Sequence, residues 1–170
     1  MKKLFLLLIT TLILIGCATT AEDGVKLTKA EKKAQQIAKV TKMLDERYYK
    51  IDIRTMHPFR YPSKQVTSTY SLEIHGDSII SYLPYLGRAY RVPYGGGKAL
   101  NFTALIDEYR EGMVKDDLRR IEIWTHNEED NYLYVVEVFK TGSASINVSS
   151  QNREHIHYTG EIDVDHKRRK

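Results

Sequence analysis

The sequence of 170 residues contains a single cysteine, Cys17, so it cannot form an internal disulfide. Its main apolar run, at residues 4–15, is shorter than the roughly 18 residues that a helix needs to span a bilayer. Phosphate loops of the Gly-x4-Gly-Lys-Ser/Thr form and Gly-x-Ser-x-Gly nucleophile elbows are both missing. These absences exclude a disulfide-stapled scaffold, a membrane span made by the apolar run and two common enzyme motifs.

The chain also has little net charge. Its formal value is +4, and two of the positive charges, Lys2 and Lys3, precede the apolar run. So small an excess gives weak grounds for an acidic partner. Aromatic residues are mostly tyrosine, with 12 Tyr against 4 Phe and 1 Trp. Tyrosine has an apolar ring and a polar tip, which suits strands that are half exposed to water.

The N-terminal segment has the layout of a secretory signal, with a positive start followed by the apolar run. It ends in Leu14-Ile15-Gly16-Cys17, and these four residues resemble the bacterial lipobox. The resemblance implies cleavage after Gly16 and transfer of a diacylglyceryl group to the Cys17 sulfur. Acylation of the new amino group, for example with palmitate, commonly follows. Lipidation also accounts for a lone cysteine in an exported chain.

A diacylglyceryl group carries two acyl chains, and stable anchoring takes about two because each buried methylene contributes about 0.8 kcal/mol. The residue after the cysteine is Ala18 rather than aspartate, which by resemblance to bacterial sorting rules favours the outer membrane. We therefore expect a lipid-anchored protein of the cell envelope, where nucleic acid is not an expected partner. The expected organisation is a signal peptide at 1–16, a lipidated tether at 17–27 and one domain at 28–170.

A helix is predicted over residues 28–47. Thr28-Lys29-Ala30-Glu31 has the capping-box form, in which the threonine oxygen accepts a backbone N–H and the glutamate reaches back to the first residue. Small or apolar residues then recur at spacings of four and three. They are Ala30, Ala34, Ile37, Thr41, Leu44 and Tyr48. This stripe predicts a single helix docked on a sheet.

From Tyr48 onward the pattern changes to the period of two that indicates strands. Strands are predicted at residues 48–54, 66–74, 78–85, 102–106, 121–125, 132–139, 144–148 and 156–164. The strand at 132–139 is expected to be buried on both faces, and a turn is expected at Glu111-Gly112. Short turns between strands favour antiparallel neighbours. The predicted fold class is mainly β (α+β): an antiparallel meander of about eight strands in a curved sheet, sandwich or flattened barrel, with one N-terminal helix.

Residues 82–98 are the least ordinary segment, because they interleave tyrosines with basic residues and end in three consecutive glycines. Flat tyrosine faces beside cations can stack on a sugar or hold an acidic group. The candidate ligand surface consists of Tyr85, Arg88, Tyr90 and Tyr94. The alternative is a long connection that folds over the open end of the sheet, with its tyrosines plugging the core.

Several short motifs resemble a family of uncharacterised bacterial envelope proteins, domain of unknown function 4251. They are Gly76-Asp77-Ser78, residues 82–90, 93–97, 101–104 and 142–146, and the pair Tyr158 and Gly160. The likeness covers most of the chain from about residue 34 onward. It implies an envelope location and a compact domain, and it supplies no activity, cofactor or catalytic residue.

His155 and His157 are two residues apart and would share a face of the last strand, as two metal ligands do. A site would need a third group, such as His126 or Glu161, which the sequence does not bring close. We therefore predict no metal and no cofactor. Acidic residues are scattered without a pair tuned for hydrolysis, so no catalytic residue is assigned.

Three functions stay open at this point. The favoured one is a non-catalytic structural or binding module of the outer envelope that contacts protein, glycan or lipid through residues 85–94. The second is a carrier whose curved sheet encloses a small apolar ligand. The third is an enzyme that acts on envelope polymers.

Overall fold

The computed structural model describes residues 28–67, 69–91 and 97–166. The predictions for residues 1–27 and for Tyr94 fall outside these residues. The elements are α2 (Lys29–Asp45), β1 (Tyr48–Pro58), β2 (Lys64–Gln65), β3 (Ser71–His75), β4 (Ser78–Tyr82), β5 (Asn101–Lys115), β6 (Leu118–His126), β7 (Asn131–Phe139), β8 (Ser143–Ser150) and β9 (Ile156–Ile162). Within the described residues, no helix is both long and apolar enough to cross a membrane.

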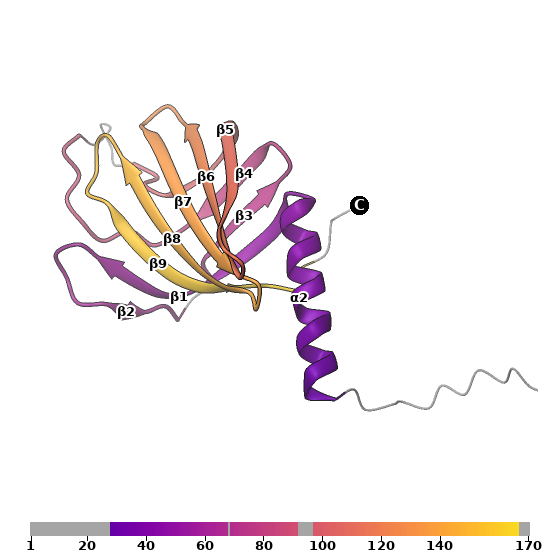
Figure 1. Cartoon of the computed structure of the whole chain (residues 1–170). Helices are drawn as coiled ribbons and strands as arrows, with labels where there is room; N and C mark the ends of the chain where they lie inside the picture. Colours follow the sequence, from indigo (N-terminus) through magenta and orange to yellow (C-terminus); the bar gives the residue numbers. More distant parts are fainter. Residues whose placement is uncertain (1–27, 68, 92–96, 167–170) are drawn as a thin grey trace, which may run out of the picture.

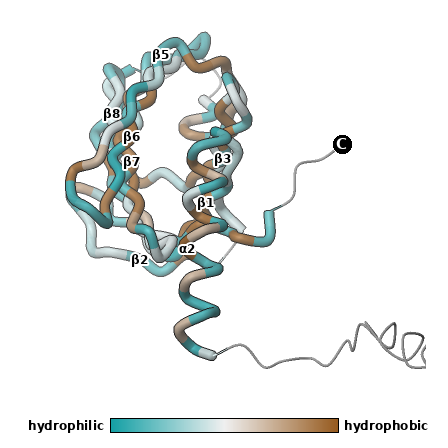
Figure 2. The backbone as a smooth tube through the Cα atoms, turned by 45° about the vertical axis from the view of Figure 1, so that its right-hand side comes forward, coloured by the Kyte–Doolittle hydropathy of each residue, from teal (hydrophilic) through white to brown (hydrophobic). Residues whose placement is uncertain are grey.

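Eight of the strands form a closed antiparallel sheet (Figures 1 and 2). β1 pairs with β3 along one edge and with β9 along the other, and the strands between them follow sequence order. Ile51 of β1, for example, faces Leu72 on one side and Ile162 on the other. The short β2 adds to β1 beyond the end of β3. The predicted mainly β meander with one N-terminal helix is confirmed, and the sheet closes into the barrel-like shape among the three considered.

The core lies inside the closed sheet and is built from alternate residues of each strand. In β7, Tyr132, Tyr134, Val136 and Val138 are buried, and the residues between them are half-buried. The prediction that this strand is buried on both faces is therefore wrong. Apolar residues such as Val135 also occupy the outer positions of this strand, which led to the prediction. A closed sheet has only one inner face, so these outer residues are not fully buried.

Two of the buried tyrosine hydroxyls inside the sheet, those of Tyr134 and Tyr158, are satisfied by β4 and by the segment that follows it. Tyr134 donates to the Ser81 hydroxyl at 3.0 Å, and Ser81 donates to the Leu100 carbonyl at 2.7 Å. Tyr158 donates to the Pro84 carbonyl at 2.6 Å. Burial raises the pKa of Tyr134 and Tyr158 well above the ordinary value, so both hydroxyls stay protonated. The connection therefore meets the core through its backbone carbonyls, whereas Tyr82 and Tyr90, two of the tyrosines expected to plug the core, are exposed.

Strand boundaries differ from prediction where pairing overrides local sequence. β5 continues through Glu111-Gly112, predicted as a turn, because Glu111 and Gly112 pair with Ile121 and Arg120 of β6. β3 begins at Ser71 rather than at residue 66, and β4 ends at Tyr82 rather than at 85. In each case the partner strand sets the length of the paired region.

The N-terminal helix α2 covers one end of the closed sheet (Figure 1). Thr28 forms the predicted capping box with Glu31. Val40 and Leu44 are the buried residues of the helix, while Ala30 and Ala34 of the predicted stripe are exposed. The helix itself is confirmed, but only its C-terminal half docks.

Gly160 tests the closure of the sheet, because an added Cβ there would overlap the backbone oxygen of Asp52 on β1. We expect Gly160→Ala to lower the free energy of unfolding by about 1–3 kcal/mol, the usual range for overpacking. Urea unfolding measures this change. The matched control is Gly112→Ala on β5, where nothing lies within 4 Å of the added carbon. Equal effects of the two substitutions would contradict a tight β1–β9 seam.

Candidate functional site

Three segments meet at the end of the closed sheet that lies opposite α2: the loop after β1, the long β4–β5 connection and the connection from β8 to β9. A cavity of about 300 Å³ opens between them. We call it the aromatic pocket, and its lining residues are Phe59, Arg60, Tyr90, Ser149, Ser150, Arg153, Glu154 and His155. The pocket is therefore formed by segments that are far apart in the sequence and that closure of the sheet brings together.

Exposed aromatic rings stand around the aromatic pocket. The side chains of Phe59 and Tyr90 are 61% and 66% exposed. The Phe59 ring centre lies 4.4 Å from that of His155, and the Arg60 guanidinium carbon lies 5.8 Å from the Phe59 ring centre. Burial of a large apolar ring is favourable. Rings left exposed around a concave surface are therefore typical of a binding site.

The buried carboxylate of Glu154 holds the Arg60 guanidinium in place at this pocket. The Glu154 side chain is 4% exposed and accepts a hydrogen bond from Arg60 Nε at 2.5 Å. It also accepts the backbone N–H of Arg88 at 3.1 Å. These two contacts hold the pKa of the Glu154 carboxyl below its usual value. Glu154 thus stays ionised, and it positions an Arg60 guanidinium whose remaining surface is half exposed.

Tyr85 acts as a clamp beneath the pocket rather than as part of its surface. Its hydroxyl donates to the carbonyls of Arg88 and Glu154, at 2.9 and 3.1 Å. Gly87 permits this arrangement, since a Cβ there would approach the Tyr85 hydroxyl to 2.7 Å. The backbone of Tyr90 also donates to the Asn152 carbonyl at 2.7 Å. Residues 88–90 are therefore pinned onto the β8–β9 connection.

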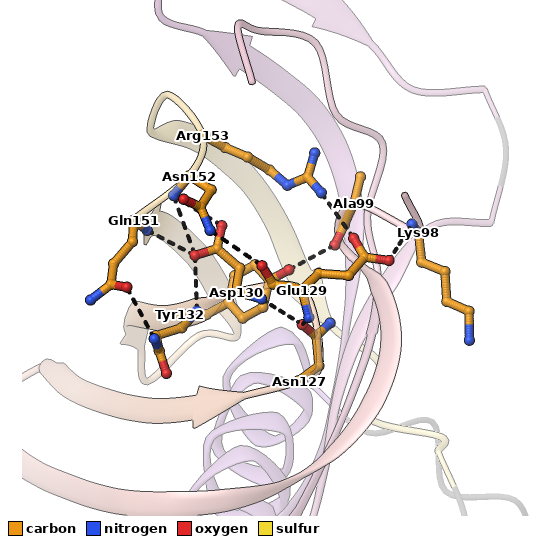
Figure 3. Close-up of polar contacts among 10 residues, drawn as sticks. Lys98, Ala99, Asn127, Glu129, Asp130, Tyr132, Gln151, Asn152 and Arg153 are labelled. Carbon is orange, nitrogen blue, oxygen red and sulfur yellow. Dashed lines mark hydrogen bonds and ion pairs between the residues drawn. The ribbon is translucent and has the colours of Figure 1, made fainter. Parts of the chain in front are cut away.

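A polar network supports the same connection from the β6–β7 turn (Figure 3). The Asp130 carboxylate, 5% exposed as a residue, accepts the backbone N–H groups of Asn131, Gln151 and Asn152. The neighbouring Glu129 accepts from the Arg153 guanidinium at 3.0 Å and from the backbone N–H of Lys98 at 2.8 Å. One acidic turn thus holds both the β8–β9 connection and the returning end of the β4–β5 connection.

The four predicted ligand residues separate into different roles. Tyr90 lines the aromatic pocket, while Tyr85 is the clamp. Arg88 has an exposed side chain and contributes its backbone N–H and carbonyl. Tyr94 is outside the described residues. Sequence reasoning missed Phe59 and Arg60, and the signal that could have found them is an aromatic-basic pair placed between Pro58 and Pro62 in a loop.

The histidines considered as metal ligands do not converge. His155 packs on Phe59, and His157 hydrogen-bonds Asn147 at 2.9 Å. His126 pairs with Asp107 at 2.7 Å. Among the described residues, the group whose ligand atoms lie close enough to hold a metal is Glu73, His75 and His166.

A wider cavity of about 500 Å³ lies between β5 and the β6–β7 turn, next to Lys98 and Glu129. Its aromatic residue, Phe102, packs against Tyr132 with ring centres 4.7 Å apart. The described lining of this cavity includes one aromatic side chain, whereas the aromatic pocket has the exposed rings of Phe59 and Tyr90 beside Arg60. The aromatic pocket is therefore the better-defined site.

Comparison with known proteins gives one family. The family model described as domain of unknown function (DUF4251) matches residues 31–162. The crystal structure of a DUF4251 family protein from Bacteroides eggerthii is similar, with a TM-score of 0.58 and 10% sequence identity over 77% of this chain and 89% of that chain. At this identity the likeness shows a shared fold. A search of curated proteins gives no match. Because the family match takes in all nine described strands and most of α2, this chain belongs to the DUF4251 family.

Proposed function

We propose that this protein is a lipid-anchored binding module of the bacterial cell envelope, held at the outer membrane through Cys17. The leader that ends in Leu14-Ile15-Gly16-Cys17 supports the anchor, and the aromatic pocket supports binding. The ligand we propose is a sugar ring that carries an acidic group. The observation that carries this choice is the exposed pair Phe59 and Tyr90 beside a fixed arginine.

The chemistry of the pocket matches an acidic sugar. A sugar ring has an apolar face of C–H groups that packs on an aromatic ring, and Phe59 and Tyr90 offer two such rings. A carboxylate on the sugar would pair with Arg60, whose planar fork of N–H donors suits carboxylate geometry. Ser149 and Ser150 line the same cavity, and serine hydroxyls can bond sugar hydroxyls. A cavity of about 300 Å³ is at the small end for ligand pockets, which favours a single ring.

The carrier alternative requires room inside the closed sheet. That interior is filled by large side chains, including the fully buried Tyr49, Tyr134 and Tyr158. Protein cores packed in this way hold few voids larger than a water molecule. A binding site at the end of the sheet therefore fits the described residues better than an enclosed apolar cavity.

The enzyme alternative requires a group that can give or take a proton near neutral pH. Glu154 lines the pocket, but Arg60 and the Arg88 N–H lower its pKa and occupy its oxygens. A carboxyl held ionised in this way suits a structural anchor rather than a general acid. His155, which also lines the pocket, packs its ring against Phe59. We therefore favour binding over catalysis.

The anchor is tested by replacing Cys17 with serine in the full chain. We expect incorporation of labelled palmitate to be lost in Cys17→Ser, because the acceptor sulfur is gone, and kept in the control Thr19→Ser. Metabolic labelling and mass spectrometry of the mature N-terminus measure this. Purified native protein with an unmodified thiol at residue 17 would refute the anchor.

The pocket is tested with two sugars that differ in one carboxylate, methyl β-glucuronide and methyl β-glucoside. We expect the glucuronide to bind more tightly, and Phe59→Ala or Tyr90→Ala to weaken it about tenfold, equivalent to about 1.4 kcal/mol. Ligand-observed NMR on the full chain in detergent measures the affinities. The control is Phe139→Ala, an exposed aromatic at the opposite end of the sheet. Equal affinity for both sugars would show that the pocket does not recognise the carboxylate.

The clamp is tested with Tyr85→Phe, which deletes the hydroxyl that donates to Arg88 and Glu154. We expect the free energy of unfolding to fall by about 1–2 kcal/mol, with the affinity for the glucuronide retained. Urea unfolding and the same NMR titration measure the two quantities. Tyr61→Phe, on a side chain 49% exposed near the pocket, serves as the control. Lost affinity at unchanged stability would instead place Tyr85 on the ligand surface.

A further inference from the structure

A cluster of metal-binding side chains lies at the other end of β1, away from the aromatic pocket. Glu73 and His75 are two residues apart on β3, so their side chains share one face of the sheet. His166 follows the end of β9. One ligand atom from each of the three residues lies within 4.8 Å of the others. We propose that Glu73, His75 and His166 bind a divalent transition metal ion of the zinc type.

The distances match a tetrahedral zinc site better than ordinary hydrogen bonds. The Nε2 atoms of His75 and His166 are 3.4 Å apart, and His75 Nε2 lies 3.4 Å from Glu73 Oε2. Protein hydrogen bonds from nitrogen are usually about 2.7–3.2 Å long. A tetrahedral zinc ion with bonds of about 2.0–2.1 Å places its ligand atoms about 3.4 Å apart. Two edges of such a tetrahedron are already present.

Tyr48 stacks on both imidazoles, and the two imidazole rings are nearly parallel. Its ring stacks on His75 at 4.5 Å and 14°, and on His166 at 5.3 Å and 17°. The two imidazole rings are 20° from parallel, with centres 5.6 Å apart. Their Nε2 atoms, 3.4 Å apart, are closer together than the ring centres. Because Tyr48 also pairs with His75 across the β1–β3 ladder, the stack is part of the sheet.

The backbone brings His166 to this position. Its N–H donates to the Asp163 carbonyl at 3.1 Å, and the Asp163 N–H donates to the Lys50 carbonyl at 2.9 Å. The turn after β9 is thereby fixed to β1, next to the strand that carries Glu73 and His75. The ligands come from two segments that are both tied to the same strand.

Neighbouring groups are compatible with a bound cation. Ser71 donates to Glu73 Oε1 at 3.3 Å, which turns Oε2 toward His75. The nearby cation Lys50 has its amine 3.0 Å from Asp52 and 4.0 Å from Asp163. The ion pairs of this amine are therefore made with Asp52 and Asp163, which lie outside the ligand set. Three protein ligands would leave a fourth position for water or an anion, as in open zinc sites.

Zinc titration by calorimetry tests this site. The protein is the full chain carrying Cys17→Ser, which removes the sole thiol, without a histidine tag. We expect a single zinc ion to bind, and His75→Ala or His166→Ala to weaken binding at least about tenfold. The matched controls are His126→Ala and His157→Ala, which remove histidines that lie outside the cluster and should keep the original affinity.

His166 lies beyond β9, so its replacement leaves every strand intact and separates loss of metal from loss of fold. Zinc should raise the unfolding temperature of the Cys17→Ser chain and leave that of His166→Ala unchanged. Cobalt should give the intense visible absorption of a tetrahedral ion, absent in His75→Ala. Failure of the Cys17→Ser chain to bind zinc, or unchanged affinity in His166→Ala, would overturn the proposal.

Discussion

The fold depends on a single strand, β1, being hydrogen-bonded along both edges. Its pairing with β9 joins Ile51 to Ile162 across most of the chain and leaves the eight-stranded sheet without an open edge. The same pairing encloses the core. It also sets the loop after β1 against the β8–β9 connection, so that Phe59 and Arg60 meet Glu154 and His155. Closure and the aromatic pocket therefore have one cause.

The β4–β5 connection serves both the core and the pocket. Its carbonyls at Pro84 and Leu100 accept the hydrogen bonds that begin at buried tyrosines, directly from Tyr158 and through Ser81 from Tyr134. Without these acceptors the hydroxyls would be buried unpaired, at a cost of about 1–3 kcal/mol each. The side chain of Tyr90 nevertheless remains exposed at the pocket. This segment thus supplies hydrogen-bond acceptors to the core at two carbonyls and an exposed ring to the pocket at Tyr90.

Features encoded locally could be predicted from the sequence. The capping box at Thr28 and Glu31 forms, and Gly76 and Gly142 adopt a positive φ in the turns after β3 and after β7. The alternation of apolar residues located all eight strands of the closed sheet. The apolar composition of β7 predicted burial on both faces, although Val135 lies on the outer face and is only half-buried. The turn predicted at Glu111-Gly112 does not form, because pairing with β6 outweighs the turn preference of glycine.

The pocket was harder to predict because its residues are far apart in the chain. Arg60 meets Glu154 only after the sheet has closed, and no spacing in the sequence relates the two. The same is true of the hydrogen bonds from residues 151 and 152 to Asp130, which in sequence is simply a polar residue in a turn. Local patterns report on strands and helices, whereas contacts between loops depend on the register of the whole sheet.

The partial docking of α2 has a geometric consequence. Residues 28–36 are exposed, and burial begins in the second half of the helix, at Val40. Before Gln36, whose side chain donates to the Thr141 carbonyl, residues 29–35 form an exposed helical extension of roughly 10 Å at 1.5 Å of rise per residue. It projects from the pole of the domain opposite the aromatic pocket. The described chain therefore begins at the end of the domain opposite the aromatic pocket.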